Sequence, residues 1–183
     1  MLSQITDVVI IKPYFYHGFR ELTLLKSLKT LFGIGLVCWS LMGCSGYLDK
    51  KLQEDIRQTL KEPDNFKLSE QDIAEFQQLG MSLDVQNQYP TLLMKFQFEN
   101  FNKKQIPDSM VQQFDQELIT LACSLFDNLS KPSEQERRAL ATVLSEDNVA
   151  IKFILQDKSS QTILDRQIPF SECPQFETFK TAN

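Results

Sequence analysis

The chain of 183 residues contains four cysteines: Cys38, Cys44, Cys123 and Cys173. A thiol can be acylated, form a disulfide, bind a metal or act as a redox nucleophile. Nucleophilic catalysis and zinc binding usually recruit a histidine as well, and the only histidine is His17, far from the last two cysteines. No Cys-x-x-Cys occurs, so thioredoxin-like redox chemistry is not favoured. The cysteines are therefore expected to serve in attachment and cross-linking.

Cys44 ends a segment, residues 24–44, that has the parts of an export signal. Lys26 and Lys29 supply its positive charge, and a largely apolar stretch, 31–42, follows. This stretch is too short to cross a bilayer as a helix, which takes about 20 residues. An uncleaved signal anchor, or a buried helix that ends in an incidental cysteine, is the alternative interpretation.

The last residues of this segment, Leu41-Met42-Gly43-Cys44, resemble the lipobox of bacterial lipoproteins. Leu41 and Gly43 match that motif, whereas Met42 is bulkier than the residue usually found there. The resemblance implies cleavage before Cys44, a diacylglycerol on its sulfur and an acyl chain on its amino group. Several acyl chains on one residue anchor a protein firmly. Ser45, rather than Asp, resembles an outer-membrane address, with the inner membrane as the other location in a Gram-negative envelope.

These features predict two parts, a lipoprotein signal peptide over residues 1–43 and a single periplasmic domain over 44–183. Residues 1–23 fit a signal peptide poorly because they include Asp7 and Glu21. We interpret them as the product of a start codon assigned too far upstream.

The predicted domain, 44–183, is acidic and lacks several kinds of catalytic equipment. It contains 15 Lys and Arg against 22 Asp and Glu, a net charge of −7. Such a surface repels phosphate, so nucleic acid is not expected as a partner. Without a histidine it cannot use a Ser-His-Asp or Cys-His mechanism. Its two glycines, Gly46 and Gly80, cannot form a phosphate-binding loop.

Apolar periodicity predicts an α+β fold. Helical spacing is expected over residues 47–60, 111–129 and 133–144. Alternation typical of strands is expected over residues 81–86, 92–99, 149–155 and 162–168. We expect an antiparallel four-stranded sheet made of two hairpins, with helices packed on one face. The first helix carries an apolar stripe, Leu48, Leu52, Ile56 and Leu60, which could bind a partner or pack on its own domain.

The remaining cysteines, Cys123 and Cys173, form an even pair once Cys44 is lipidated and Cys38 is removed with the leader. In an oxidising compartment they are expected to form one disulfide that joins the long helix to the C-terminus. Redox catalysis is the alternative role for this pair.

This order of elements resembles that of small proteobacterial envelope lipoproteins, including the beta-class pilotins of type II secretion. The matching features are Cys44, a hairpin over 79–99, Cys123 within a long helix, a hairpin over 148–168, and Cys173. The stretch from Ser133 to Ser145 departs from the family, which is usually tight there. The resemblance implies a lipoprotein that escorts an outer-membrane secretin, but it assigns no partner-binding residue.

We therefore expect a non-enzymatic, membrane-anchored binding or escort protein whose partner is another envelope protein. The alternative is an acidic inhibitor or immunity-type lipoprotein directed at a basic envelope enzyme. A carboxylate-based enzyme is a remote alternative, because no pair of carboxylates stands out. Neither Glu54-Asp55 nor Glu146-Asp147 has the spacing of a calcium loop, so exposed charges are expected there. No cofactor and no metal site are predicted.

Overall fold

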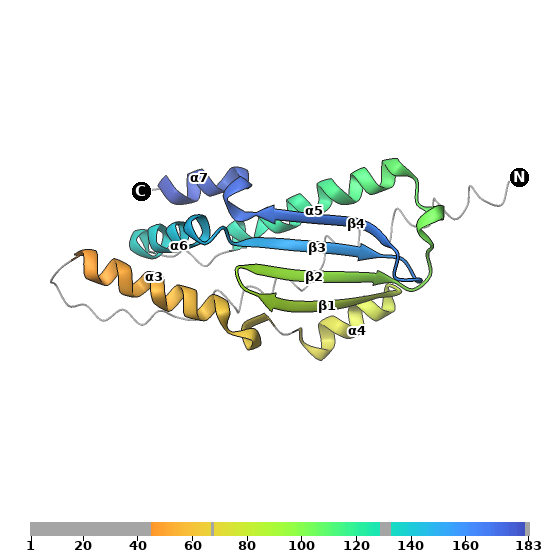
Figure 1. Ribbon diagram of the computed structural model, residues 1–183, viewed down its shortest axis with the longest axis horizontal. Coiled ribbons are helices and arrows are strands. Elements are labelled where there is room, and N and C mark those ends of the chain that lie inside the picture. The colour runs from red at the N-terminus through yellow and green to blue at the C-terminus, as the bar shows by residue number, and fades with distance from the viewer. Residues whose placement is uncertain (1–44, 67, 129–132, 182–183) are drawn as a thin grey trace, which may run out of the picture.

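A computed structural model describes residues 45–66, 68–128 and 133–181, which fold into an α+β domain with one four-stranded sheet (Figure 1). The sheet has the order β1-β2-β3-β4. Its strands are β1 (Met81–Gln88), β2 (Thr91–Phe98), β3 (Ala150–Gln156) and β4 (Thr162–Pro169). The pairs β1–β2 and β3–β4 are antiparallel hairpins, which confirms both hairpins predicted from the sequence.

The sheet is mixed, so the prediction of a fully antiparallel sheet is wrong. Strands β2 and β3 run parallel, from the pairing of Thr91 with Ala150 to that of Gln97 with Gln156. Parallel neighbours need a crossover connection, and the long helix α5 (Asp108–Asn128) provides the return path. Its 21 residues span about 31 Å, slightly more than the roughly 26 Å of an eight-residue strand. The chain therefore returns to the end of the sheet at which β2 began.

Five α-helices occur in the part of the chain that the structure describes. They are α3 (Ser45–Lys61), α4 (Glu70–Gln78), α5, α6 (Glu134–Glu146) and α7 (Pro174–Thr181). Short 3-10 helices lie at η1 (Pro63–Phe66), η2 (Lys103–Gln105) and η3 (Phe170–Glu172). The sequence predicted α3, α5 and α6, including the capping box of Ser133 with Glu136. It did not predict α4 or α7.

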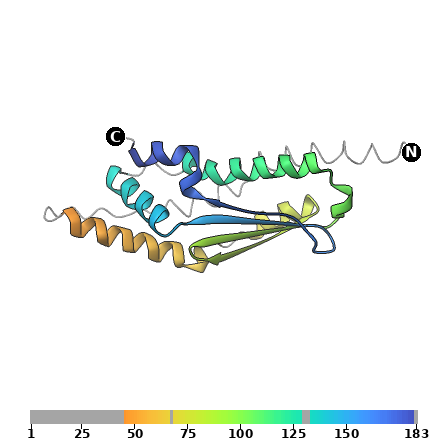
Figure 2. The ribbon, with the colours of Figure 1, turned by 45° about the horizontal axis from the view of Figure 1, so that its top comes forward.

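Helices α4 and α5 cover the same face of the sheet, and α3, α6 and α7 lie beyond one end of it (Figures 1 and 2). Phe96 and Phe98 project from one face of β2, because they are two residues apart. Phe76 of α4 packs on Phe96 with ring centroids 5.9 Å apart. Phe114 of α5 stacks on Phe98 at 6.1 Å. The core therefore lies between one sheet face and these two helices.

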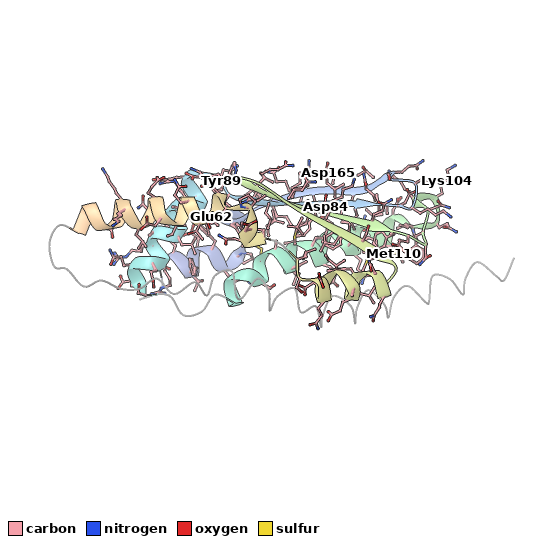
Figure 3. All side chains as sticks on the ribbon, turned by 90° about the horizontal axis from the view of Figure 1, so that it is seen from below. Glu62, Asp84, Tyr89, Lys104, Met110 and Asp165 are labelled. Carbon is pink, nitrogen blue, oxygen red and sulfur yellow. A yellow bond between two sulfur atoms is a disulfide. The ribbon has the colours of Figure 1, made fainter. Side chains whose placement is uncertain are left out.

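The opposite face of the sheet is polar. Asp84, Lys95 and Asp165 lie in one row across it, with Ile154 between Lys95 and Asp165. Figure 3 shows Asp84 and Asp165 on the side of the sheet away from α4 and α5. Within residues 45–66, 68–128 and 133–181, no helix combines the length and hydropathy that a membrane span requires.

Candidate functional site

The predicted lipobox and lipidation residues, Leu41, Met42, Gly43 and Cys44, lie outside the described residues. The description begins with the next residue, Ser45, which is the first residue of α3. Helix α3 is thus the first described element after the predicted lipidation position. For this reason, the contacts that hold α3 on the domain form the candidate site.

The two cysteines predicted to pair, Cys123 and Cys173, are at disulfide distance. Their sulfur atoms lie 2.09 Å apart and their Cα atoms 5.3 Å apart, within the usual range for disulfides. Cys123 belongs to α5, and Cys173 follows η3 just before α7. Both side chains are buried in the core, so the bond fastens the C-terminal segment to the long helix.

Helix α3 is held on α6 by an ion cluster that sequence reasoning did not find. Arg57 Nε donates to Asp147 Oδ2 at 2.9 Å, and its Nη2 donates to Asp147 Oδ1 at 3.2 Å. The same Nη2 donates to Glu146 Oε2 at 2.8 Å. Asp147 caps the C-terminus of α6, and it follows Glu146, the last helical residue. This fork geometry is the one in which a guanidinium binds a carboxylate most strongly.

Tyr89 joins the cluster from the turn between β1 and β2. Its hydroxyl donates to Asp147 Oδ2, and Lys61 Nζ lies 5.3 Å from the centroid of its ring. Burial raises the pKa of Tyr89, and the hydrogen bond to Asp147 raises it further. The hydrogen bond from Arg57 holds the pKa of Asp147 below its ordinary value, against the effect of burial. At neutral pH, Asp147 is therefore ionised beside Arg57, and the Tyr89 hydroxyl keeps the proton that it donates to Asp147.

The apolar side of α3 also packs on the domain. Leu60 is buried in the core, and Ile56 packs against the core residues. A small apolar pocket of about 30 Å³ lies beside the cluster, lined by residues that include Leu60, Tyr89 and Leu144. This volume accommodates a water molecule or a methyl group, not an organic ligand. The packing interpretation of the apolar stripe is thus confirmed at Ile56 and Leu60.

The charged pairs weighed from the sequence have different environments. Glu54 and Asp55 are exposed, as expected. Glu146 is also exposed, but Asp147 is not, because its side chain is only 20% exposed and binds Arg57. The expectation of exposed charges is therefore wrong for Asp147. Across the described residues, no three His, Cys, Asp or Glu side chains are grouped so that they could hold a metal ion.

A buried carboxylate, Asp157, organises the far end of the molecule. It accepts the backbone N–H groups of Lys103, Ser159 and Gln161 at 2.9, 2.8 and 2.9 Å. The bond from Lys103, followed by the other two, lowers the pKa of Asp157, against the effect of burial. Asp157 thereby ties the turn between β3 and β4 to η2. All of its partners are backbone groups, so its role is structural.

No protein-family model, curated protein or solved structure matches this chain.

Proposed function

We propose that this protein is a lipoprotein of the Gram-negative cell envelope that binds and escorts another envelope protein without catalysing a reaction. The observation that carries the proposal is the position of α3. This helix is the first described element after the lipobox-like Leu41-Met42-Gly43-Cys44, and it is bonded to α6 through Arg57. A lipid on Cys44 would thus lie close in sequence to a helix that contacts the rest of the domain at Asp49, Arg57 and Leu60.

The remaining chemistry of the domain supports this proposal. The disulfide between Cys123 and Cys173 suits an oxidising compartment such as the periplasm. The sequence from 44 onward contains no histidine, which removes the commonest general base and metal ligand. The pocket beside α3 is too small for a substrate. This pocket therefore gives no support to a substrate-binding role, and the proposal rests on a surface of the described domain.

The geometry also sets an orientation for an anchored domain. Helix α3 has 17 residues and is about 25 Å long, and it runs from the far end of the helical group toward the sheet (Figure 1). A lipid at its start would hold α3, α6 and α7 near the membrane and direct the β3–β4 turn away from it. A domain held this close to the membrane can contact a partner that lies in or on the same membrane, as expected for an escort protein.

The test is to express the full gene in a Gram-negative host and to measure the intact mass and membrane partition of the product. We expect a mass that starts at residue 44 with added acyl chains, and partition into the membrane fraction. Cys44→Ser should abolish both. Cys38→Ser is the matched control, because it removes a thiol from the same leader and should leave acylation unchanged. A wild-type product that keeps the residues before 44, or that stays unacylated, would refute the anchor.

The binding role needs a separate measurement. Crosslinking in intact cells, followed by capture of the protein, should enrich one envelope protein over a control domain that carries the same lipid anchor. If wild-type protein enriches nothing beyond that control, the escort role is wrong, even when the anchor is present. Hydrolysis of envelope substrates by the purified protein would also contradict the non-enzymatic assignment.

A further inference from the structure

The outer edge of β1 differs from the outer edge of β4. Edge strands are usually protected by bulges, prolines or lysines, because their unpaired backbone groups can pair with another strand. Strand β4 has such features: a register shift opposite Leu155 and Gln156, Arg166 within it and Pro169 at its end. Strand β1 pairs regularly with β2 over all eight residues and contains no Pro, Lys or Arg.

The direction of the backbone groups of β1 follows from one hydrogen bond. Glu99 N–H donates to Gly80 O at 2.9 Å, so this pair is hydrogen-bonded across the hairpin. In an antiparallel ladder the hydrogen-bonded pairs alternate with pairs whose N–H and C=O groups point outward. The residues with outward groups are therefore Met81, Leu83, Val85 and Asn87. Within the described residues, no backbone hydrogen bond outside the ladder involves any of these four.

The side chains around this edge are acidic and apolar. Residues 68–94 contain Glu70, Asp72, Glu75 and Asp84 and no Lys or Arg. Asp72 is buried, and Lys95 of β2 lies opposite Asp84, on the inner side of β1. Leu83 and Val85 are only half-buried and lie on the core face of β1. Ile73 of α4, the helix beside β1, is 41% exposed. A strand added here would meet Asp84 on one face and apolar side chains on the other.

We infer that the outer edge of β1 is a docking site for an extended segment of a partner protein in which basic and apolar side chains alternate. The segment would add a fifth strand to the sheet. Its basic side chains would lie beside Asp84, and its apolar ones beside Leu83 and Val85. This inference rests on the proposed function, because it assumes that the protein binds another envelope protein. It deepens that function by naming the kind of segment through which the partner binds.

The probe is a fluorescent ten-residue peptide of alternating Lys and Val, titrated into the full protein purified in detergent and followed by anisotropy. Asp84→Lys should weaken binding about fivefold or more, since it repels the basic side chains. Val85→Pro should weaken it comparably, because it removes an outward N–H without removing a ladder bond. Asp165→Lys is the matched control, since Asp165 ends the same row of side chains at the opposite edge.

Four results would overturn the inference. The first is equal binding of the same peptide with alternate backbone amides methylated, which would exclude strand pairing. The second is equal binding of a Glu-Val peptide, and the third is a loss in Asp165→Lys as large as that in Asp84→Lys. The fourth is a protein dimer that Val85→Pro dissociates, in which case a second copy occupies the edge. If the wild-type protein lacks acyl chains but still binds the peptide, the anchor is refuted and this site stands.

Discussion

Arg57 of α3 forms a two-pronged hydrogen bond with Asp147, the residue that caps α6, across 90 residues of sequence. Both side chains are 20% exposed, and the two helices that they join, α3 and α6, lie beyond the end of the sheet (Figure 1). The pair is therefore more than a surface ion pair, because each partner has lost most of its contact with water. It is one of the polar connections of α3 to the rest of the domain, together with the hydrogen bonds from Gln135 to Asp49 and from Asn87 to Leu60 O.

Replacing Arg57 by Ala should lower the free energy of unfolding by about 2 kcal/mol, as expected when a charged hydrogen-bond partner is removed from a part-buried carboxylate. Urea unfolding measures this loss, and hydrogen exchange should show faster exchange of α3 amides than of sheet amides. Arg138→Ala is the matched control. Arg138 pairs with Glu134 on an exposed face, so its loss should change stability by less than about 0.5 kcal/mol. Equal effects of the two variants would contradict the role assigned to Arg57.

The pKa of Asp147 predicts an acid-sensitive contribution to stability. Arg57 lowers this pKa in the folded protein below the value of about 3.9 found in an unfolded chain. The stabilisation is therefore complete above that unfolded value and is lost as the pH falls below it. Urea unfolding between pH 7 and pH 3 should show a steeper acid loss for wild type than for Asp147→Asn. Arg57→Ala should flatten the curve in a similar way, and a slope unchanged in both variants would contradict the argument.

The two hairpins and the helices α3, α5 and α6 follow from periodicity, because each depends on side chains that are close in sequence. The parallel pairing of β2 with β3 does not, since it depends on the path of α5 and α6 through space. Helix α4 was missed because its capping box uses Asp72 with Ser69 instead of the more usual Glu or Gln. Helix α7 starts with Pro174, and proline is common at the first position of a helix, but this helix is too short for apolar periodicity to predict it.

The candidate site was less predictable than the fold. Arg57, Tyr89 and Asp147 come from three elements, and none of them belongs to a motif. Only the capping position of Asp147, directly after α6, could have suggested a role for that carboxylate. The pairing of Cys123 with Cys173 was predictable because only two cysteines follow the predicted leader and the predicted lipidation residue, Cys44. Chemistry that depends on residue type is thus easier to predict than contacts that depend on packing.

Gly80 should not tolerate a side chain. Its φ is +68°, a left-handed conformation that costs other residues about 1–2 kcal/mol. A Cβ at this position would also lie 2.6 Å from Asn100 Nδ2. Gly80→Ala is therefore expected to lower the free energy of unfolding by about 1–2 kcal/mol, measured by urea unfolding. Gly80→Ala combined with Asn100→Ala should recover only the steric part of this loss, whereas full recovery would show that the conformation of Gly80 is not a source of strain.

Removal of the disulfide should destabilise the domain without changing its sheet. Cys123 and Cys173 are 50 residues apart, and a cross-link over such a loop stabilises a protein by up to about 4 kcal/mol through the entropy of the unfolded chain. We expect Cys123→Ala with Cys173→Ala to lower the free energy of unfolding by about 2–4 kcal/mol. Each single variant should lose nearly as much, because either one breaks the bond. Addition of a reductant to wild type should reproduce the loss and should leave the double variant unaffected. A double variant as stable as wild type would show that the bond does not constrain the chain in solution.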